Sequence, residues 1–128
     1  AAIALCGHGS KILIADGNYP AGTTLGENAE LVYLNLTPGS PTVTEILEVL
    51  VSAVWIEAAC VMMPADGSDA PAFAEFRRLL PDNAPLQKLE RFEFYEEASN
   101  DDVCLIIVSG DTRHYANLLL TIGVRPEN

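Results

Sequence analysis

Basic residues are scarce in this 128-residue chain, which has seven lysines and arginines against eighteen aspartates and glutamates. The net charge of −11 would repel a phosphate backbone, so the composition argues against nucleic acid as a partner. It argues equally against binding to an anionic membrane surface. A neutral small molecule is not disfavoured by this charge.

Long apolar runs are also missing, since no stretch approaches the ~20 residues that a membrane-spanning helix requires. The longest candidate, residues 43–63, is interrupted by Glu45, Glu48 and Glu57. We find no signal peptide. The chain begins without methionine, and we expect that residues have been lost from its start.

Cysteines and glycine motifs are too sparse to predict a disulfide framework, a zinc site or a glycine-rich nucleotide-binding loop. The three cysteines, Cys6, Cys60 and Cys104, have no paired spacing, and the last two lie in apolar runs. A buried free thiol behaves as a small hydrophobic group. We therefore predict three reduced structural thiols, which fits a reducing cytoplasm.

Apolar residues make up 49% of the chain, enough for one domain with a buried core. Helical spacing of apolar residues predicts helices over 43–54 and 73–80, and the turn at 66–69 can cap the second. The segment 89–98 has features of both a strand and a helix. Strands are expected at 11–15, 31–36, 58–63, 103–108 and 117–122. This alternation predicts one α/β domain over residues 1–128, with a mixed, partly parallel sheet flanked by helices.

Polar side chains bracket the first predicted strand, with His8 before it and Asp16 at its end. Histidine can give and take a proton near neutral pH. Ligands of α/β sheets gather at the carboxyl ends of strands, where a carboxylate can accept hydrogen bonds from hydroxyl groups. Both residues also have ordinary explanations, because His8 could be a surface or capping residue and Asp16 a turn former.

Arg91 and Tyr95 are spaced four residues apart in an acidic and aromatic segment. The five donors of arginine suit a polyhydroxylated ligand or a carboxylate. The alternatives are a salt bridge from Arg91 to Glu90 or a nearby acid, and a half-buried core position for Tyr95.

A second polar group follows the predicted strand 103–108. Tyr115 and Asn117 are two residues apart, so they would face the same way in an extended segment. The amide of Asn117 can both donate and accept, which matches a hydroxyl group. His114 would then face elsewhere, and we expect it to be a surface residue.

In this order, the motifs resemble the D-ribose pyranase / L-fucose mutarotase family. The opening motif is Gly7-His8-Gly9 followed by an apolar strand and Asp16, and residues 110–124 resemble the closing segment of the family. Residues 91–98 resemble a segment typical of the L-fucose mutarotase branch. The family has a helix before its histidine motif, and six residues precede Gly7 here, so we expect a truncated helix.

The resemblance implies an isomerase that interconverts the cyclic forms of a neutral monosaccharide such as L-fucose or D-ribose. It implies His8 as the general acid/base and Tyr95 as a second candidate for proton transfer. The substrate-binding residues that it implies are Asp16, Arg91, Tyr115, Ala116 and Asn117. It implies no metal or organic cofactor, and a pocket at a subunit boundary of a homo-oligomer, a ring-shaped decamer or smaller.

Two other kinds of function fit the same sequence. A sugar sensor or transport accessory protein would use the same pocket without turnover. A structural subunit would use its acidic surface and apolar faces for assembly alone, but the concentration of polar groups at strand ends disfavours it.

Overall fold

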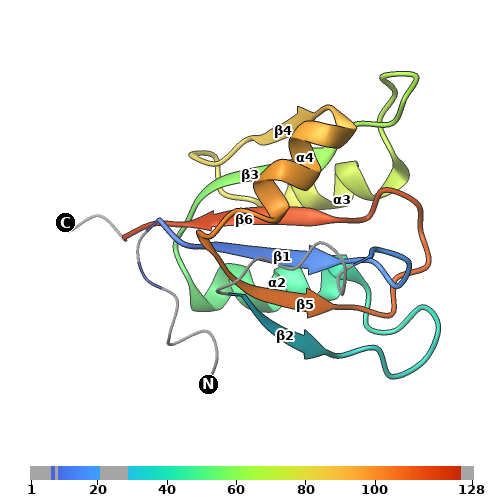
Figure 1. The fold of residues 1–128 in the computed structure, drawn as a ribbon, viewed down its shortest axis with the longest axis horizontal. Helices are drawn as coiled ribbons and strands as arrows, with labels where there is room; N and C mark the ends of the chain where they lie inside the picture. The colour runs from blue at the N-terminus through green and yellow to red at the C-terminus, as the bar shows by residue number, and fades with distance from the viewer. Residues whose placement is uncertain (1–6, 8, 21–28, 125–128) are drawn as a thin grey trace.

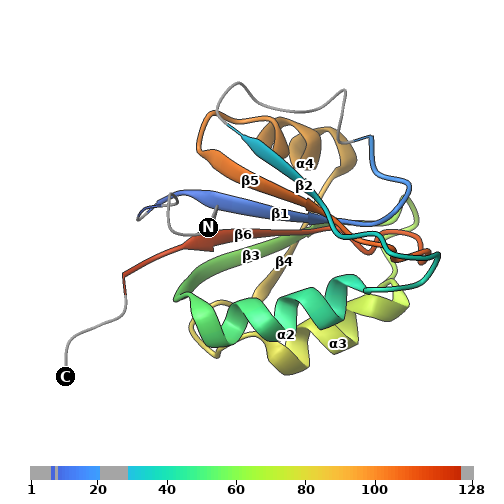
Figure 2. The same cartoon turned by 90° about the horizontal axis from the view of Figure 1, so that it is seen from below.

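The computed structural model describes residues 7, 9–20 and 29–124, which form a six-stranded sheet with helices on both faces (Figures 1 and 2). The strands are β1 (Lys11–Ala15), β2 (Glu30–Tyr33), β3 (Ile56–Met62), β4 (Leu86–Leu89), β5 (Val103–Val108) and β6 (Leu118–Ile122). The helices are α2 (Val43–Ala53), α3 (Pro71–Leu79) and α4 (Arg91–Ala98).

The strand order is β2-β5-β1-β6-β3-β4, and β6 runs antiparallel to both of its neighbours. The pairs β1–β5, β2–β5 and β3–β4 are parallel. The carboxyl ends of five strands therefore meet the amino end of β6 at one edge of the sheet, on the right in Figure 1. This arrangement confirms the predicted α/β fold with a mixed, partly parallel sheet.

The two faces of the sheet carry separate apolar cores. Figure 2 shows α2 and α3 on one face and α4 on the other. Along β1, Ile12 and Ile14 pack into the core beneath α2 and α3, whereas Leu13 and Ala15 pack into the core beneath α4. The nearly continuous apolar character of β1 follows from this burial on both faces.

Helix α2 begins where the sequence predicts it, because Thr42 and Glu45 form a reciprocal capping box. Its apolar stripe of Val43, Ile46, Leu47 and Leu50 is buried. The segment 89–98, ambiguous in the sequence, divides at Glu90. Strand β4 ends at Leu89, and the Glu90 side chain then accepts hydrogen bonds from the first turn of α4.

The helix cap and the cysteine states differ from the predictions. The turn at 66–69 does not cap α3, because Ala70 is the N-cap and Pro71 begins the helix without a side-chain cap. Asp69 instead forms ion pairs with Arg77 and Lys88. The cysteine prediction also fails, because Cys104 is disulfide-bonded.

Cys60 is free, as predicted, and burial raises the pKa of its thiol to about 11. The helix expected before His8 lies outside the described residues. The longest helix among the described residues, α2, has 11 residues, and none of these helices could span a membrane.

Candidate functional site

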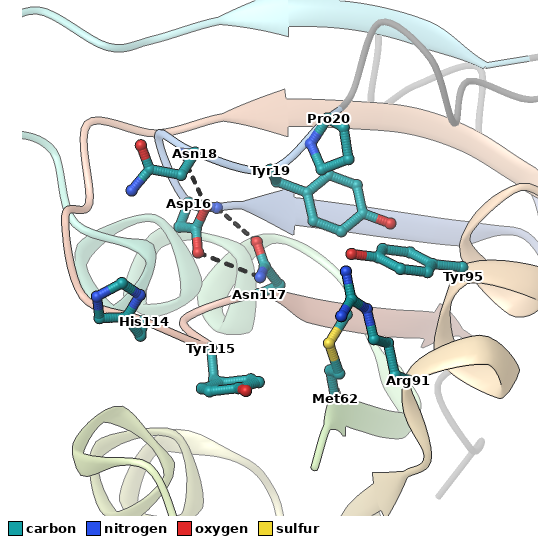
Figure 3. Close-up of a pocket in the computed structure, with 10 residues that line it drawn as sticks. All are labelled: Asp16, Asn18, Tyr19, Pro20, Met62, Arg91, Tyr95, His114, Tyr115 and Asn117. Carbon is teal, nitrogen blue, oxygen red and sulfur yellow. Dashed lines mark hydrogen bonds between the residues drawn. The ribbon is translucent and has the colours of Figure 1, made fainter. Parts of the chain in front are cut away.

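A cavity of about 230 Å³ opens at the edge where the carboxyl ends of the strands meet the start of β6 (Figure 3). This volume is below the ~300–1,000 Å³ of pockets for drug-sized ligands, so it suits a small molecule. The lining residues are Asp16, Asn18, Tyr19, Pro20, Met62, Arg91, Tyr95, His114, Tyr115 and Asn117.

Asp16 and Asn117 form the buried polar centre of this cavity. The Asn117 amide accepts a hydrogen bond from the Asp16 backbone N–H at 2.7 Å and donates to Asp16 Oδ2 at 3.2 Å. The backbone N–H of Asn18 donates to Asp16 Oδ1 at 2.9 Å. These bonds join the end of β1 to the start of β6 and fix the orientation of both side chains.

The charge of Asp16 has no cationic partner among these contacts. The residue is 5% exposed, and burial raises the pKa of its carboxyl above the ordinary value. The hydrogen bonds from Asn18 and Asn117 act in the opposite direction and are outweighed. A ligand hydroxyl that donated to this carboxylate would replace part of the solvation that burial removes.

Arg91 and Tyr95 approach the cavity from the first turns of α4 (Figure 3). The Arg91 guanidinium lies 5.7 Å from the centroid of the Tyr95 ring, within cation–π range. The ring of Tyr19 lies 5.8 Å from that of Tyr95. None of the ion pairs within the described ranges involves Arg91, and Glu90 caps α4 instead. The donors of Arg91 therefore face the cavity without an acidic partner there.

The segment before β6 is not extended as predicted. Tyr115 has a φ of 62°, in the left-handed region, and this turn breaks the alternation of side chains. As a result, His114, Tyr115 and Asn117 all line the cavity, although His114 is exposed as expected. Ala116 is fully buried in the core beneath α2 and α3 and is not among the lining residues.

The structure thus brings together Asp16, Arg91, Tyr95, Tyr115 and Asn117, while His8 lies outside the described residues. Four further residues line the cavity and were not predicted, Asn18, Tyr19, Pro20 and Met62, and His114 was predicted only as a surface residue. The first three lie in the turn just after Asp16 and Gly17, and that position could have suggested them. Met62 ends β3, and only the strand order shows that it meets β1 and β6.

The arrangement combines a buried acceptor, an amide that donates and accepts, an arginine fork and three tyrosine rings. Such a set can satisfy the hydroxyls and apolar faces of a neutral polyhydroxylated ligand. No group of three or more His, Cys, Asp or Glu side chains that could hold a metal occurs among the residues that the structure describes.

Comparison with known proteins identifies the family of this chain. The model of the RbsD / FucU transport protein family matches residues 1–125. The chain belongs to this family. The predicted family is therefore confirmed.

Curated relatives of the RbsD / FucU family match over nearly the whole chain. The human fucose mutarotase is 32% identical over 96% of this chain and 84% of its own length. The D-ribose pyranase of Variovorax paradoxus (strain S110) is 31% identical over 95% of this chain and 88% of its own length.

Solved structures of the family have the same fold. FucU from Bifidobacterium longum superposes with a TM-score of 0.80, at 30% identity, over 97% of this chain and 94% of that one. The fucose mutarotase from Streptococcus pneumoniae, solved in complex with L-fucose, gives a TM-score of 0.78. Its identity is 24%, over 94% of this chain and 86% of that one.

Proposed function

We propose that the protein is an isomerase that interconverts the cyclic forms of a free monosaccharide such as L-fucose by acid/base-catalysed ring opening. The observation that carries this proposal is the buried Asp16–Asn117 pair, which shares one small cavity with Arg91 and Tyr95. The relatives named fucose mutarotase and D-ribose pyranase support it, because the chain aligns with them over most of their length.

The reaction needs two proton transfers and no redox step. The anomeric hydroxyl gives up its proton and the ring oxygen gains one. The bond between the anomeric carbon and the ring oxygen breaks, and a carbonyl group forms. Rotation of the open form followed by closure gives the other anomer, and closure through a different hydroxyl changes the ring size. One positioned acid or base typically contributes about 10²–10⁴-fold to such a step.

The residues take the following roles in this proposal. His8 protonates the ring oxygen, and Tyr95 or a water molecule moves the other proton. Asp16 and Asn117 hold hydroxyl groups at the buried end of the cavity, and Arg91 donates to hydroxyls from α4. Tyr115 forms a wall of the cavity, and Ala116 supports that wall from the core beneath α2 and α3.

The assembly and the location of the protein are further parts of the proposal. We propose a homo-oligomer, a ring-shaped decamer or smaller, with the cavity at a subunit boundary. Cytoplasmic localisation stays a prediction, and the disulfide at Cys104 removes the cysteine argument for it.

The proposal is tested by NMR exchange on equilibrated L-fucose, with D-ribose in parallel. Inversion of one anomeric signal should transfer to the other faster with protein than with buffer. We expect His8→Ala to lower the accelerated rate by about 10²–10⁴-fold, because it removes the general acid/base. Full exchange activity in His8→Ala would exclude that role.

A binding protein without turnover is the second candidate, favoured by the description of the family as transport proteins. It predicts a rise in melting temperature with L-fucose or D-ribose and no acceleration of exchange. The isomerase predicts both effects, so the two measurements together separate the candidates.

A further inference from the structure

Arg113 is the centre of a cluster of polar side chains outside the cavity. Its backbone N–H and Nε donate to Asp111 Oδ1, both at 3.0 Å, and its Nη2 donates to Asp111 Oδ2 at 2.7 Å. Its Nη1 donates to Glu75 of α3 at 2.9 Å, and Nη2 also donates to Thr44 of α2 at 3.1 Å. Thr44 in turn donates to Glu75 at 2.6 Å. One guanidinium thus ties the loop after β5 to both helices on one face of the sheet.

The same loop supports the backbone on each side of Asp16. Ser109 donates to the Ala15 carbonyl from its backbone N–H at 2.9 Å and from its hydroxyl at 2.6 Å. The Gly17 N–H donates to the Asp111 carbonyl at 2.8 Å. A Cβ at Gly17 would lie 3.3 Å from that carbonyl oxygen, so the two backbones are closely packed. The position of Asp16 therefore depends on the conformation of residues 109–111.

The loop continues from Arg113 into the wall of the cavity. Tyr115 has the left-handed φ of 62°, which is unfavourable for a residue with a side chain and persists where the surrounding structure enforces it. Arg113 holds the chain two residues before Tyr115, and the hydrogen bonds of Asn117 to Asp16 hold it two residues after. The strained residue is thus fixed between two anchors.

We propose that Arg113 is a positioning residue for the sugar site. Through Asp111, Glu75 and Thr44 it fixes the loop that carries Tyr115 and supports Asp16. This inference rests on the proposed function, because it concerns the same cavity. Arg113 itself is not one of the residues that line the cavity, and four of its five guanidinium donors are occupied within the cluster.

The test compares Arg113→Met and Arg113→Lys with Arg77→Met in the full chain. Arg77 is the matched control, because it is on α3 and its guanidinium pairs with Asp69 at 2.8 Å, not with Asp111, Glu75 or Thr44. The readouts are the melting temperature and the KM and kcat of L-fucose exchange by NMR, measured well below the lowest melting temperature. KM does not depend on how much of a sample is folded, so a purely structural role would leave KM unchanged.

We expect Arg113→Met to raise KM roughly 10- to 100-fold, because small displacements of binding groups have effects of this size. Arg113→Lys should give an intermediate KM, since one ammonium cannot reproduce the planar fork of arginine. Arg77→Met should leave KM unchanged. A lower melting temperature with an unchanged KM in Arg113→Met would overturn the inference. If the unsubstituted protein accelerates exchange of neither sugar, the proposed function fails and the inference fails with it.

Discussion

Asp16 and Asp111 are two buried aspartates at the same edge of the sheet, with 5% and 1% of their surface exposed. Their environments shift their pKa values in opposite directions. Burial raises the pKa of Asp16. Burial acts on Asp111 in the same direction, but hydrogen bonds from Arg113 and Val43 outweigh it and hold the pKa of Asp111 below its ordinary value.

The difference lies in how many acceptor positions the protein itself fills. A carboxylate offers about four lone-pair sites. Those of Asp111 accept four hydrogen bonds, three from Arg113 and one from the Val43 N–H at the start of α2. In the described part of the chain, the carboxylate of Asp16 accepts hydrogen bonds from Asn18 and Asn117, and a weaker one from the Tyr19 backbone N–H also lowers its pKa. Asp111 is therefore saturated by the fold, whereas Asp16 keeps acceptor capacity toward the cavity.

Removal of Asp111 should have the largest effect on stability. We expect Asp111→Ala to lower the free energy of unfolding by about 3 kcal/mol, because Arg113 would lose its main partner in a largely buried site. Denaturant unfolding followed by circular dichroism measures this change. Asp69→Ala serves as the control, since it removes two exposed ion pairs and should change stability little. Equal losses of unfolding free energy in the two variants would show that the Asp111 cluster stabilises the fold no more than exposed ion pairs do.

The sequence was sufficient to predict most of the elements around these two aspartates. The apolar runs of β1, β3, β5 and β6 and the stripe of α2 carry periodic signals that local reasoning detects. Asp16 was predicted as a site residue because it directly follows one of these runs. The resemblance to a known family added Ala116 and the catalytic roles of His8 and Tyr95.

Other features depended on contacts that are distant in the chain. Asp111 was not predicted as a structural residue, since nothing near it in the chain indicates that its carboxylate meets the start of α2, 68 residues away. The left-handed conformation of Tyr115 also has no local signal, because tyrosine rarely adopts it. Because of this one φ angle, His114 lines the cavity. The predicted alternation of side chains would have turned it away from the cavity.

Asp16→Asn should weaken the site without weakening the fold. We expect sugar affinity to fall by about 10- to 100-fold, the equivalent of one hydrogen bond to a charged group. Stability should change little, because the variant no longer buries a charge that lacks a cationic partner but also exchanges one acceptor oxygen beside the Asn117 and Asn18 donors for an NH2 group. Thermal shift with and without L-fucose, together with the KM of exchange, measures both effects.

The matched control for Asp16→Asn is Asp66→Asn. Asp66 accepts a hydrogen bond from the backbone N–H of Ser68, two residues on, as Asp16 does from Asn18. Asp66 lies outside the cavity, so its substitution should leave sugar affinity unchanged. A clear loss of stability with unchanged sugar affinity in Asp16→Asn would reduce Asp16 to a structural turn residue.

The smallest expected effect is a difference in the pH dependence of stability. The pKa of Asp16 is raised on folding, so the folded state binds the proton more tightly than the unfolded state. The protonated carboxyl therefore favours the folded state, and stability falls as pH rises from the ordinary value of 3.8 through the raised pKa. Each tenfold difference in proton affinity between the two states is worth about 1.4 kcal/mol.

Asp111 should affect stability at pH values below 3.8. Its pKa is lowered on folding, so the stability that it contributes is complete above pH 3.8 and is lost as pH falls through the lowered pKa. Melting curves of the unsubstituted protein, Asp16→Asn and Asp111→Asn between pH 3 and 6 separate the two. The stability of Asp16→Asn relative to the unsubstituted protein should increase as pH rises above 4. The loss of stability in Asp111→Asn should become smaller as pH falls below 4. If both differences changed in the same pH range and direction, the opposite roles of the two aspartates would be wrong.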